Sequence, residues 1–177
     1  MATIKKTLWI LSGAAGAGKS TWANGEAQGR NAMIISRDNI RFDLMNENDA
    51  YFANETKVWR CFIDQIEYAL VYSDYEDIYV DATHINQKSR NKLLDAISRK
   101  VALEYVDIKV VYFNVCAAVC RQRNARRTGR RQVPDKAIMR MMNQFEIPTF
   151  NEKYKYKEIW CVDASGNIVK EIDDHEE

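Results

Sequence analysis

The sequence has little that would tie it to a membrane, a zinc ion or an oxidising compartment. Its two histidines stand far from its four cysteines, and no two cysteines have the C-x-x-C spacing. We therefore expect neither a zinc site nor a disulfide framework. No apolar run approaches the ~20 residues of a membrane-spanning helix, and the first six residues lack the pattern of a secretion signal. These absences predict a cytoplasmic protein without a membrane partner.

An excess of charge is also missing. The 26 Lys and Arg residues against 25 Asp and Glu residues leave a formal net charge of +1. Any affinity for nucleic acid must therefore come from a local patch. A chain of 177 residues, 46% hydrophobic, is long enough to bury a full core, and it shows no internal repeat, low-complexity run or linker. We predict a single domain over residues 1–177.

Strand-like and helix-like segments alternate along the whole chain. Segments rich in Ile, Val, Tyr and Trp predict strands at 6–12, 32–36, 77–82, 105–113 and 157–162. Helices are predicted at 19–28, 38–45, 53–72, 87–100, 116–127 and 134–145. The longest shows an apolar stripe at four-residue spacing, formed by Val58, Phe62, Ile66 and Leu70. This alternation favours an α/β fold with a mainly parallel five-stranded sheet flanked by helices. A turn at 165–167 would let residues 157–172 close with a small hairpin.

One segment carries a clear chemical signature. Residues 13–20 match the pattern G-x-x-x-x-G-K-S of a phosphate-binding P-loop, directly after the first predicted strand. The glycines let backbone N–H groups turn toward a phosphate chain, and the following helix presents its positive end to the same anions. Lys19 would reach the β- and γ-phosphates, and the Ser20 hydroxyl would ligate Mg²⁺. We predict that ATP or GTP binds with Mg²⁺ to Gly13, Ala14, Ala15, Gly16, Ala17, Gly18, Lys19, Ser20 and Thr21.

The end of the second predicted strand carries two candidate site residues. In parallel sheets ligands bind beyond the carboxyl ends of the strands, which is where Asp38 and Arg41 fall. A carboxylate near Lys19 can accept a hydroxyl proton during phosphoryl transfer, so Asp38 is the candidate general base and a candidate magnesium ligand. Asp38 also suits the N-cap of the next helix, and both roles are compatible. Arg41, on the same helical face, either pairs with Asp38 alone or binds an anionic group of the acceptor.

The third predicted strand ends in a second acidic residue. Asp81 resembles the magnesium-side acidic motif of P-loop proteins, and we expect it to hold the metal together with Ser20. Ala82 follows, where P-loop ATPase motors usually carry a Glu that polarises water, so the sequence favours transfer to an acceptor over hydrolysis. Thr83 and His84 are placed to hydrogen-bond that acceptor, although a single histidine is more often incidental.

Arginine is concentrated in one segment. Six arginines fall within residues 121–131, which begin on a predicted helix, and Pro134 opens the next helix. Their forked side chains suit phosphate oxygens, and a helix–loop–helix with arginines at its tip is typical of a lid over a nucleotide. The other interpretation is a solvated basic face. We expect a lid over about 121–134 in which one or two arginines are catalytic and others contact substrate phosphates.

Together these motifs resemble the kinase domain of the bacteriophage T4 polynucleotide kinase family. In the same order come the P-loop followed by Thr21-Trp22-Ala23, the R-D-x-x-R element at 37–41, a D-x-T element at 81–83 and an R-N-x-x-R-x-G-like lid. The similarity spans roughly residues 7 to 150. It implies a P-loop kinase fold and Mg²⁺-dependent transfer of a γ-phosphoryl group to the 5′-hydroxyl end of RNA or DNA, as in nucleic-acid repair.

The resemblance also implies roles for single residues. Asp38 would be the general base for the 5′-hydroxyl, while Arg41, assisted by Thr83, would hold the phosphate on the 3′ side of the terminal nucleoside. Arg123 and Arg127 match the catalytic lid arginines, with Arg123 also binding the nucleotide and Arg127 meeting the transferring phosphoryl.

Two departures from the family pattern leave alternatives open. An extra residue before Gly129 would allow Arg126 to replace Arg127, and Ala-Thr-His follows Asp81 where the family has Thr-Asn. A small-molecule kinase on the same fold, as in zeta toxins and gluconate kinases, would not need Arg41 to meet a phosphate. A nucleotide-dependent switch would instead use the arginine segment to bind nucleic acid. The sequence does not separate RNA from DNA or ATP from GTP, and it does not predict the oligomeric state.

Overall fold

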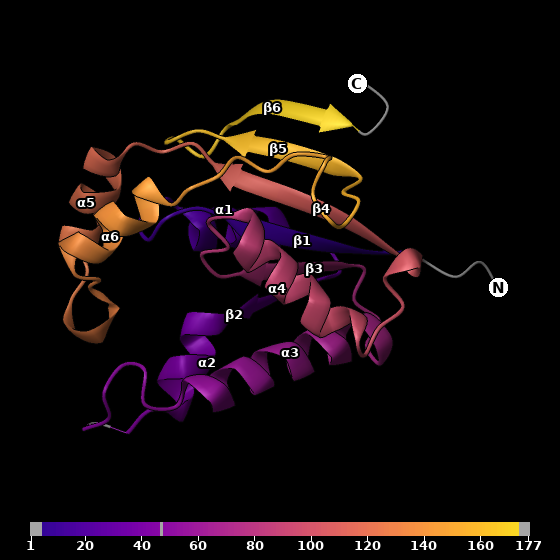
Figure 1. Ribbon diagram of the computed structural model, residues 1–177, viewed down its shortest axis with the longest axis horizontal. Helices are drawn as coiled ribbons and strands as arrows, with labels where there is room; N and C mark the ends of the chain where they lie inside the picture. The colour runs from indigo at the N-terminus through magenta and orange to yellow at the C-terminus, as the bar shows by residue number, and fades with distance from the viewer. Residues whose placement is uncertain (1–4, 47, 174–177) are drawn as a thin grey trace.

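Six strands form one sheet in the order β2-β3-β1-β4-β5-β6 (Figure 1). The structure is a computed structural model that describes residues 5–46 and 48–173. β1 to β5 run parallel, and β6 pairs antiparallel with β5. The strands are β1 (Lys6–Ser12), β2 (Ala32–Ser36), β3 (Asp77–Asp81), β4 (Val106–Phe113), β5 (Glu158–Val162) and β6 (Ile168–Asp173).

The prediction of a mainly parallel α/β sheet is confirmed, but the expected number of five strands is wrong. The sixth strand, β6, is the second arm of the expected hairpin, and Gly166 forms its turn at a φ of 86°. β6 lies at the edge of the sheet, with Lys170 and Glu171 in its middle. An edge strand needs no continuous apolar run, which is why its sequence did not stand out.

Helices cover both faces of the sheet (Figure 1). α3 and α4 share a hydrophobic cluster with one face, and α1, α5 and α6 share a second cluster with the other. The helices are α1 (Lys19–Ala27), α2 (Arg37–Leu44), α3 (Glu55–Val71), α4 (Gln87–Ser98), α5 (Ala117–Ala125) and α6 (Asp135–Asn143), with short 3₁₀ helices at Leu103–Tyr105 and Gly129–Arg131. No helix in the described ranges is long and apolar enough to cross a membrane.

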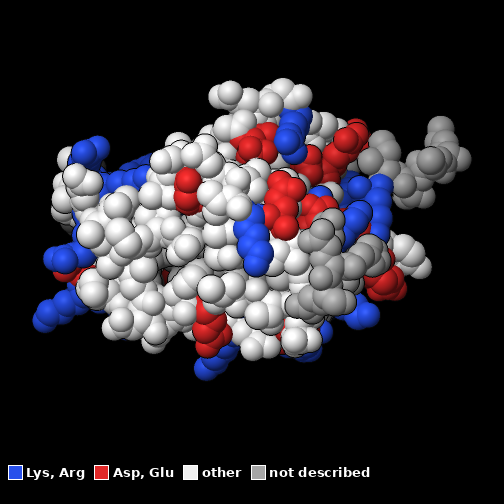
Figure 2. All heavy atoms as spheres, turned by 90° about the horizontal axis from the view of Figure 1, so that it is seen from above, with Lys and Arg blue, Asp and Glu red and all other residues white. Residues whose placement is uncertain are grey.

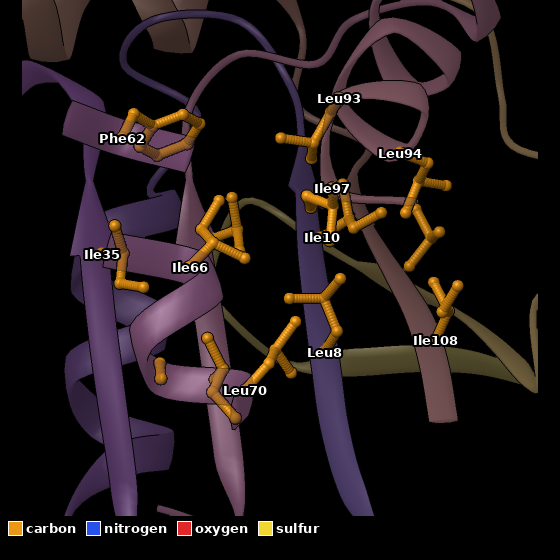
Figure 3. Packing of buried hydrophobic residues seen from close by; sticks show 14 of the residues in the cluster. Leu8, Ile10, Ile35, Phe62, Ile66, Leu70, Leu93, Leu94, Ile97 and Ile108 are labelled. Atoms are coloured by element: carbon orange, nitrogen blue, oxygen red, sulfur yellow. The ribbon is translucent and has the colours of Figure 1, made fainter. Parts of the chain in front are cut away.

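The two faces have different cores. On the α3–α4 face, aliphatic side chains of both helices pack on β1, and the predicted apolar stripe of α3 is confirmed as buried (Figure 3). On the other face Trp22 of α1 packs edge-on against Tyr79 and Phe113, with ring centroids 6.2 and 5.8 Å apart. Edge-to-face aromatic pairs of this kind fix their neighbours closely. They hold α1, and with it the end of the P-loop, against the sheet.

The topology brings the predicted site residues to one end of the molecule. β1 lies between β3 and β4, so the chain leaves β1 toward one half of the sheet for β2 and later crosses to the other half for β4. Ligands bind at such a switch point, outside the carboxyl ends of the strands. The P-loop, α2 and the α5–α6 segment all follow strands at that end (Figure 1).

Candidate active site

A cavity of about 690 Å³ opens at the carboxyl ends of the parallel strands. Four segments form its walls: the P-loop with the start of α1, α2 with the loop to α3, the residues after β3, and the segment from α5 to α6. Segments far apart in the sequence, from Ala15 to Met141, therefore share one site. Of the residues that the sequence suggested, the cavity is lined by Ala15, Gly16, Gly18, Lys19, Ser20, Thr21, Asp38, Arg41, Asp81, Thr83 and Arg127.

The P-loop lysine is buried at the base of this cavity. Gly18 caps α1 in the left-handed conformation, at a φ of 99°, so the chain turns directly from the loop into the helix. Lys19 is 8% exposed, and its Nζ donates hydrogen bonds to the carbonyl oxygens of Gly13, at 2.9 Å, and Ala14, at 2.8 Å. Burial lowers the pKa of Lys19. A desolvated ammonium group held by loop carbonyls is well placed to exchange them for phosphate oxygens.

Ser20 and Asp81 form the oxygen pair expected for a metal. The Ser20 hydroxyl donates to Asp81 Oδ2 at 2.6 Å. Burial raises the pKa of Asp81, and the nearby Lys19 opposes that effect. Within the described residues no group of three or more His, Cys, Asp or Glu side chains is arranged to hold a metal ion. A hydroxyl and a carboxylate nevertheless fit Mg²⁺, which is usually bound by one or two protein oxygens together with substrate phosphates and water.

Asp38 projects into the cavity from the first turn of α2. The N-cap of α2 is Ser36, whose hydroxyl accepts from the Asn39 N–H, so the interpretation of Asp38 as the cap is wrong. The Asp38 side chain is 63% exposed. Its Oδ1 accepts from Arg41 Nη1 and from the Tyr51 hydroxyl, the latter at 3.1 Å. The carboxylate is thus oriented from one side and open to an incoming group on the other.

Arg41 is buried within a wider network than the sequence suggested. Its Nη2 donates to Glu55 Oε2 and its Nη1 to the Tyr51 hydroxyl, both at 3.0 Å. Burial pulls the pKa of Arg41 down, but Tyr51, Glu55 and Asp38 outweigh it and raise the value. Glu55 also pairs with Arg37. Tyr51 and Glu55 belong to no motif of the sequence, and only the packing of α3 beside α2 brings them to Arg41.

The arginine segment contributes to the cavity selectively. Arg127 and Arg130 line it together with Arg140 of α6, which lies outside the predicted arginine segment. Arg123 instead donates to the Ala17 carbonyl at 3.3 Å and to the Ala164 carbonyl, so it ties α5 to the P-loop. Arg126 is exposed and does not line the cavity. The catalytic and binding roles of Arg123 and Arg126 stay predictions. Figure 2 shows Lys and Arg side chains at the α5–α6 end and acidic side chains over the β5–β6 side.

The tip of this segment reaches across the cavity. Arg130 Nη1 donates to the carbonyl oxygen of Asn46, in the loop after α2, at 2.9 Å. The guanidinium of Arg131 lies 5.3 Å from the ring centroid of Phe42 in α2. Arg130 and Arg131 therefore bridge the two sides of the site, and the role of this segment as a lid stays a prediction.

His84 does not line the cavity, so it is not placed to bind an acceptor. It is 4% exposed, has a φ of 36°, and donates from Nδ1 to the Leu11 carbonyl oxygen at 3.1 Å. Burial lowers its pKa to about 3. Below pH 6.5 the unfolded chain would bind a proton that the folded chain does not, so stability falls with falling pH until about pH 3.

We therefore predict that His84→Asn makes stability less dependent on pH. Asparagine tolerates the positive φ at this position. The wild type should lose up to about 1.4 kcal/mol of unfolding free energy per pH unit below pH 6 through this group. Urea unfolding at pH 7, 6 and 5 measures how steeply the unfolding free energy changes with pH in the wild type and in His84→Asn. Parallel slopes for the two proteins would show that His84 is not held neutral by the fold.

The fold and the cavity together define a protein of the P-loop kinase-like class. A P-loop follows β1 within the sheet, and arginines of the α5–α6 segment share one cavity with the Asp38 carboxylate. The chain belongs to the AAA domain family, whose sequence profile matches residues 8–148. No curated protein matches the chain.

Three solved structures illustrate the shared fold. A chain of the Pnkp1/Rnl/Hen1 RNA repair complex has 22% identity and a TM-score of 0.66. The match covers 81% of this protein but only 45% of the chain from the complex. A fungal RNA kinase has 12% identity and a TM-score of 0.66, covering 92% and 76%. A gluconokinase from Sinorhizobium meliloti has 16% identity and a TM-score of 0.54, covering 92% and 84%. At these identities the similarity is one of fold, and the acceptors differ.

Proposed function

We propose that the protein is a polynucleotide kinase that transfers the γ-phosphoryl group of ATP or GTP to the 5′-hydroxyl end of RNA or DNA. One observation carries the proposal: an exposed carboxylate, Asp38, is paired with a buried arginine, Arg41, in the same cavity as the P-loop Lys19. A general base and an anion-binding group on the acceptor side describe transfer to a phosphate-bearing alcohol.

The donor side is formed by the P-loop. Lys19 would exchange its two carbonyl contacts for oxygens of the β- and γ-phosphates, and Ser20 and Asp81 would hold Mg²⁺. When bound, the ion neutralises negative charge on the phosphates. Arg127 lines the cavity and would contact the transferring phosphoryl group, whereas Arg126 lies outside it. These contacts stabilise the negative charge that shifts toward the leaving diphosphate.

The acceptor side is formed by α2 and the loop after it. The 5′-oxygen would attack the γ-phosphorus, the bond to the β-phosphate oxygen would break, and Asp38 would take the hydroxyl proton. Arg41 would bind the phosphate on the 3′ side of the terminal nucleoside, with Thr83 beside it in the cavity wall. Glu55 and Tyr51 hold Arg41 in place for that contact. The fold likeness to RNA-repair and RNA-kinase structures supports a nucleic-acid acceptor and a role in repair.

A γ-phosphate transfer assay across acceptors tests the proposal. We expect labelled phosphate on 5′-hydroxyl RNA or DNA and on 3′-nucleotides, and at least tenfold less on nucleosides that lack a 3′-phosphate, because Arg41 then has no anion to bind. Gluconate and nucleosides serve as acceptors of the small-molecule class. Efficient transfer to one of these, with none to oligonucleotides, would replace the proposal by a small-molecule kinase. Nucleotide-dependent binding of nucleic acid without transfer would indicate a switch.

A further inference from the structure

A second depression lies outside the cavity, along one side of α4. We call it the α4 groove. It is formed by successive turns of α4, by Trp59 from the neighbouring α3 and by Glu146, which follows α6. Figure 1 shows α3 and α4 on the same side of the sheet. Its basic and amide-bearing side chains on α4 and at its end are Gln87, Lys88, Asn91, Lys92 and Arg99.

The two acidic side chains of the α4 groove already have hydrogen-bonding partners, and one of them has an opposite charge beside it. Asp95 pairs with Lys153 and accepts from the Tyr154 hydroxyl at 2.6 Å. The Glu146 carboxylate accepts from the Gln87 N–H at 2.8 Å. Among the described residues neither Lys88 nor Arg99 forms an ion pair, and both are exposed. Arg99 affects Asp95 only through its charge, which lowers the pKa of Asp95, and forms no ion pair with it. The groove therefore presents unpaired positive charge to solvent.

The α4 groove is connected to the cavity through Trp59. The guanidinium of Arg37, which lines the cavity, lies 5.1 Å from the centroid of the Trp59 ring. The ammonium group of Lys92, which lines the groove, lies 5.0 Å from the same centroid. Two cations on one indole are stabilised by its π system. Trp59 therefore joins the wall of the cavity to the α4 groove, with Arg37, which is paired with Glu55, on the cavity side and Lys92 on the groove side.

We propose that the α4 groove binds the sugar–phosphate backbone of a single-stranded acceptor, downstream of the 5′ end held in the cavity. This inference rests on the proposed function and specifies its substrate as a chain of several nucleotides. Lysine and arginine on a helix surface contact phosphates without reading bases, so the groove adds affinity and not sequence specificity. Trp59 lies between Arg37 and Lys92, each about 5 Å from the centroid of its ring.

The experiment compares acceptors of different length in the variant Lys88→Gln/Arg99→Gln. For a 5′-hydroxyl single-stranded 12-mer we expect KM to rise on the order of tenfold at 0.1 M salt, since two phosphate contacts are lost. The plot of log KM against log salt should flatten by about 0.7 for each contact. For a dinucleotide, which ends inside the cavity, KM and kcat should not change. The matched control Lys5→Gln/Lys170→Gln removes the same charge elsewhere and should leave all values as in the wild type.

Binding of a 3′-labelled 12-mer, followed by fluorescence anisotropy, separates this inference from the proposed function. A wild type that binds the 12-mer but transfers no phosphoryl group contradicts the kinase assignment, while weaker binding by the groove variant still supports the groove. Equal binding by variant and control overturns the groove, as does an equal rise of KM for the dinucleotide. Competition by polyglutamate at the same charge concentration also overturns it, since the groove would then be a general anion surface.

Discussion

Asp38→Asn is expected to abolish phosphoryl transfer while nucleotide binding persists. Asparagine has the same shape and keeps an oxygen that accepts from Arg41 and Tyr51, so the contacts around the site remain. What is lost is the ability to take the hydroxyl proton, and general-base catalysis contributes about 10²- to 10⁴-fold in rate. We expect kcat to fall by that factor, with the dissociation constant of ATP within about twofold of the wild-type value.

A control on the same helix makes the result interpretable. Asp43→Asn changes an exposed carboxylate of α2 that does not line the cavity, and it should leave kcat unchanged. Asp43→Asn should unfold at the wild-type urea midpoint and Asp38→Asn close to it, since neither side chain is buried and Arg41 keeps its ion pair with Glu55. Transfer at the wild-type rate by Asp38→Asn would exclude Asp38 as the base. Loss of ATP binding together with transfer would move its role to the donor side.

The P-loop side of the site could be predicted from the sequence because it is local. The P-loop pattern spans eight consecutive residues, and its geometry is determined by its own glycines and by the helix that follows. Lys19 and Ser20 consequently lie where the pattern places them, in the cavity wall. Asp81 was predictable for a related reason. It ends the strand next to β1, and adjacent parallel strands bring their carboxyl ends together.

The α2 side of the site could be predicted only in part, because it depends on how helices pack. Asp38 and Arg41 were found from their place after β2, but their partners Tyr51 and Glu55 come from the loop and the first turn of α3. No local pattern marks those two residues. The lid shows the same limit: the sequence located its arginines, whereas packing decided that Arg127 and Arg130 line the cavity and Arg123 contacts the P-loop.

Sequence patterns were least informative where an ordinary residue has an unusual environment. His84 follows a strand at the functional edge, which suggested contact with an acceptor. Its positive φ turns the side chain into the core, where it contacts the Leu11 carbonyl oxygen and lies near Phe62. The sequence placed His84 correctly at the end of β3, but it did not predict the direction of the side chain. Such a backbone conformation in a non-glycine residue has no reliable sequence signal.

Gly16→Ala is expected to damage both the fold and nucleotide binding. A Cβ atom at this position would lie 2.4 Å from the Cys120 carbonyl oxygen in α5, and Gly16 has a φ of 83°. The obstacle is helix backbone, so it cannot rotate away, and the P-loop and α5 must separate. That separation would displace Arg123 and Arg127 together with the loop. We expect ATP binding to weaken by at least 100-fold, because the backbone N–H groups no longer converge on the phosphates.

Alanine substitutions at two other glycines separate the two causes by which Gly16→Ala should lower stability, which are steric overlap and backbone strain. Gly29→Ala meets no atom within 4 Å but has a φ of 72°, so it should cost only the conformational strain of about 1–2 kcal/mol. Gly25 lies within α1, has no atom within 4 Å of an added Cβ and has no positive φ. Gly25→Ala should therefore stabilise the folded protein by about 0.5–1 kcal/mol. Gly16→Ala should cost about 1–3 kcal/mol more than Gly29→Ala, the usual range for overpacking. Urea unfolding and ATP titration of the three variants measure this order. Wild-type ATP affinity in Gly16→Ala would show that close contact between the P-loop and α5 is not needed to shape the phosphate site.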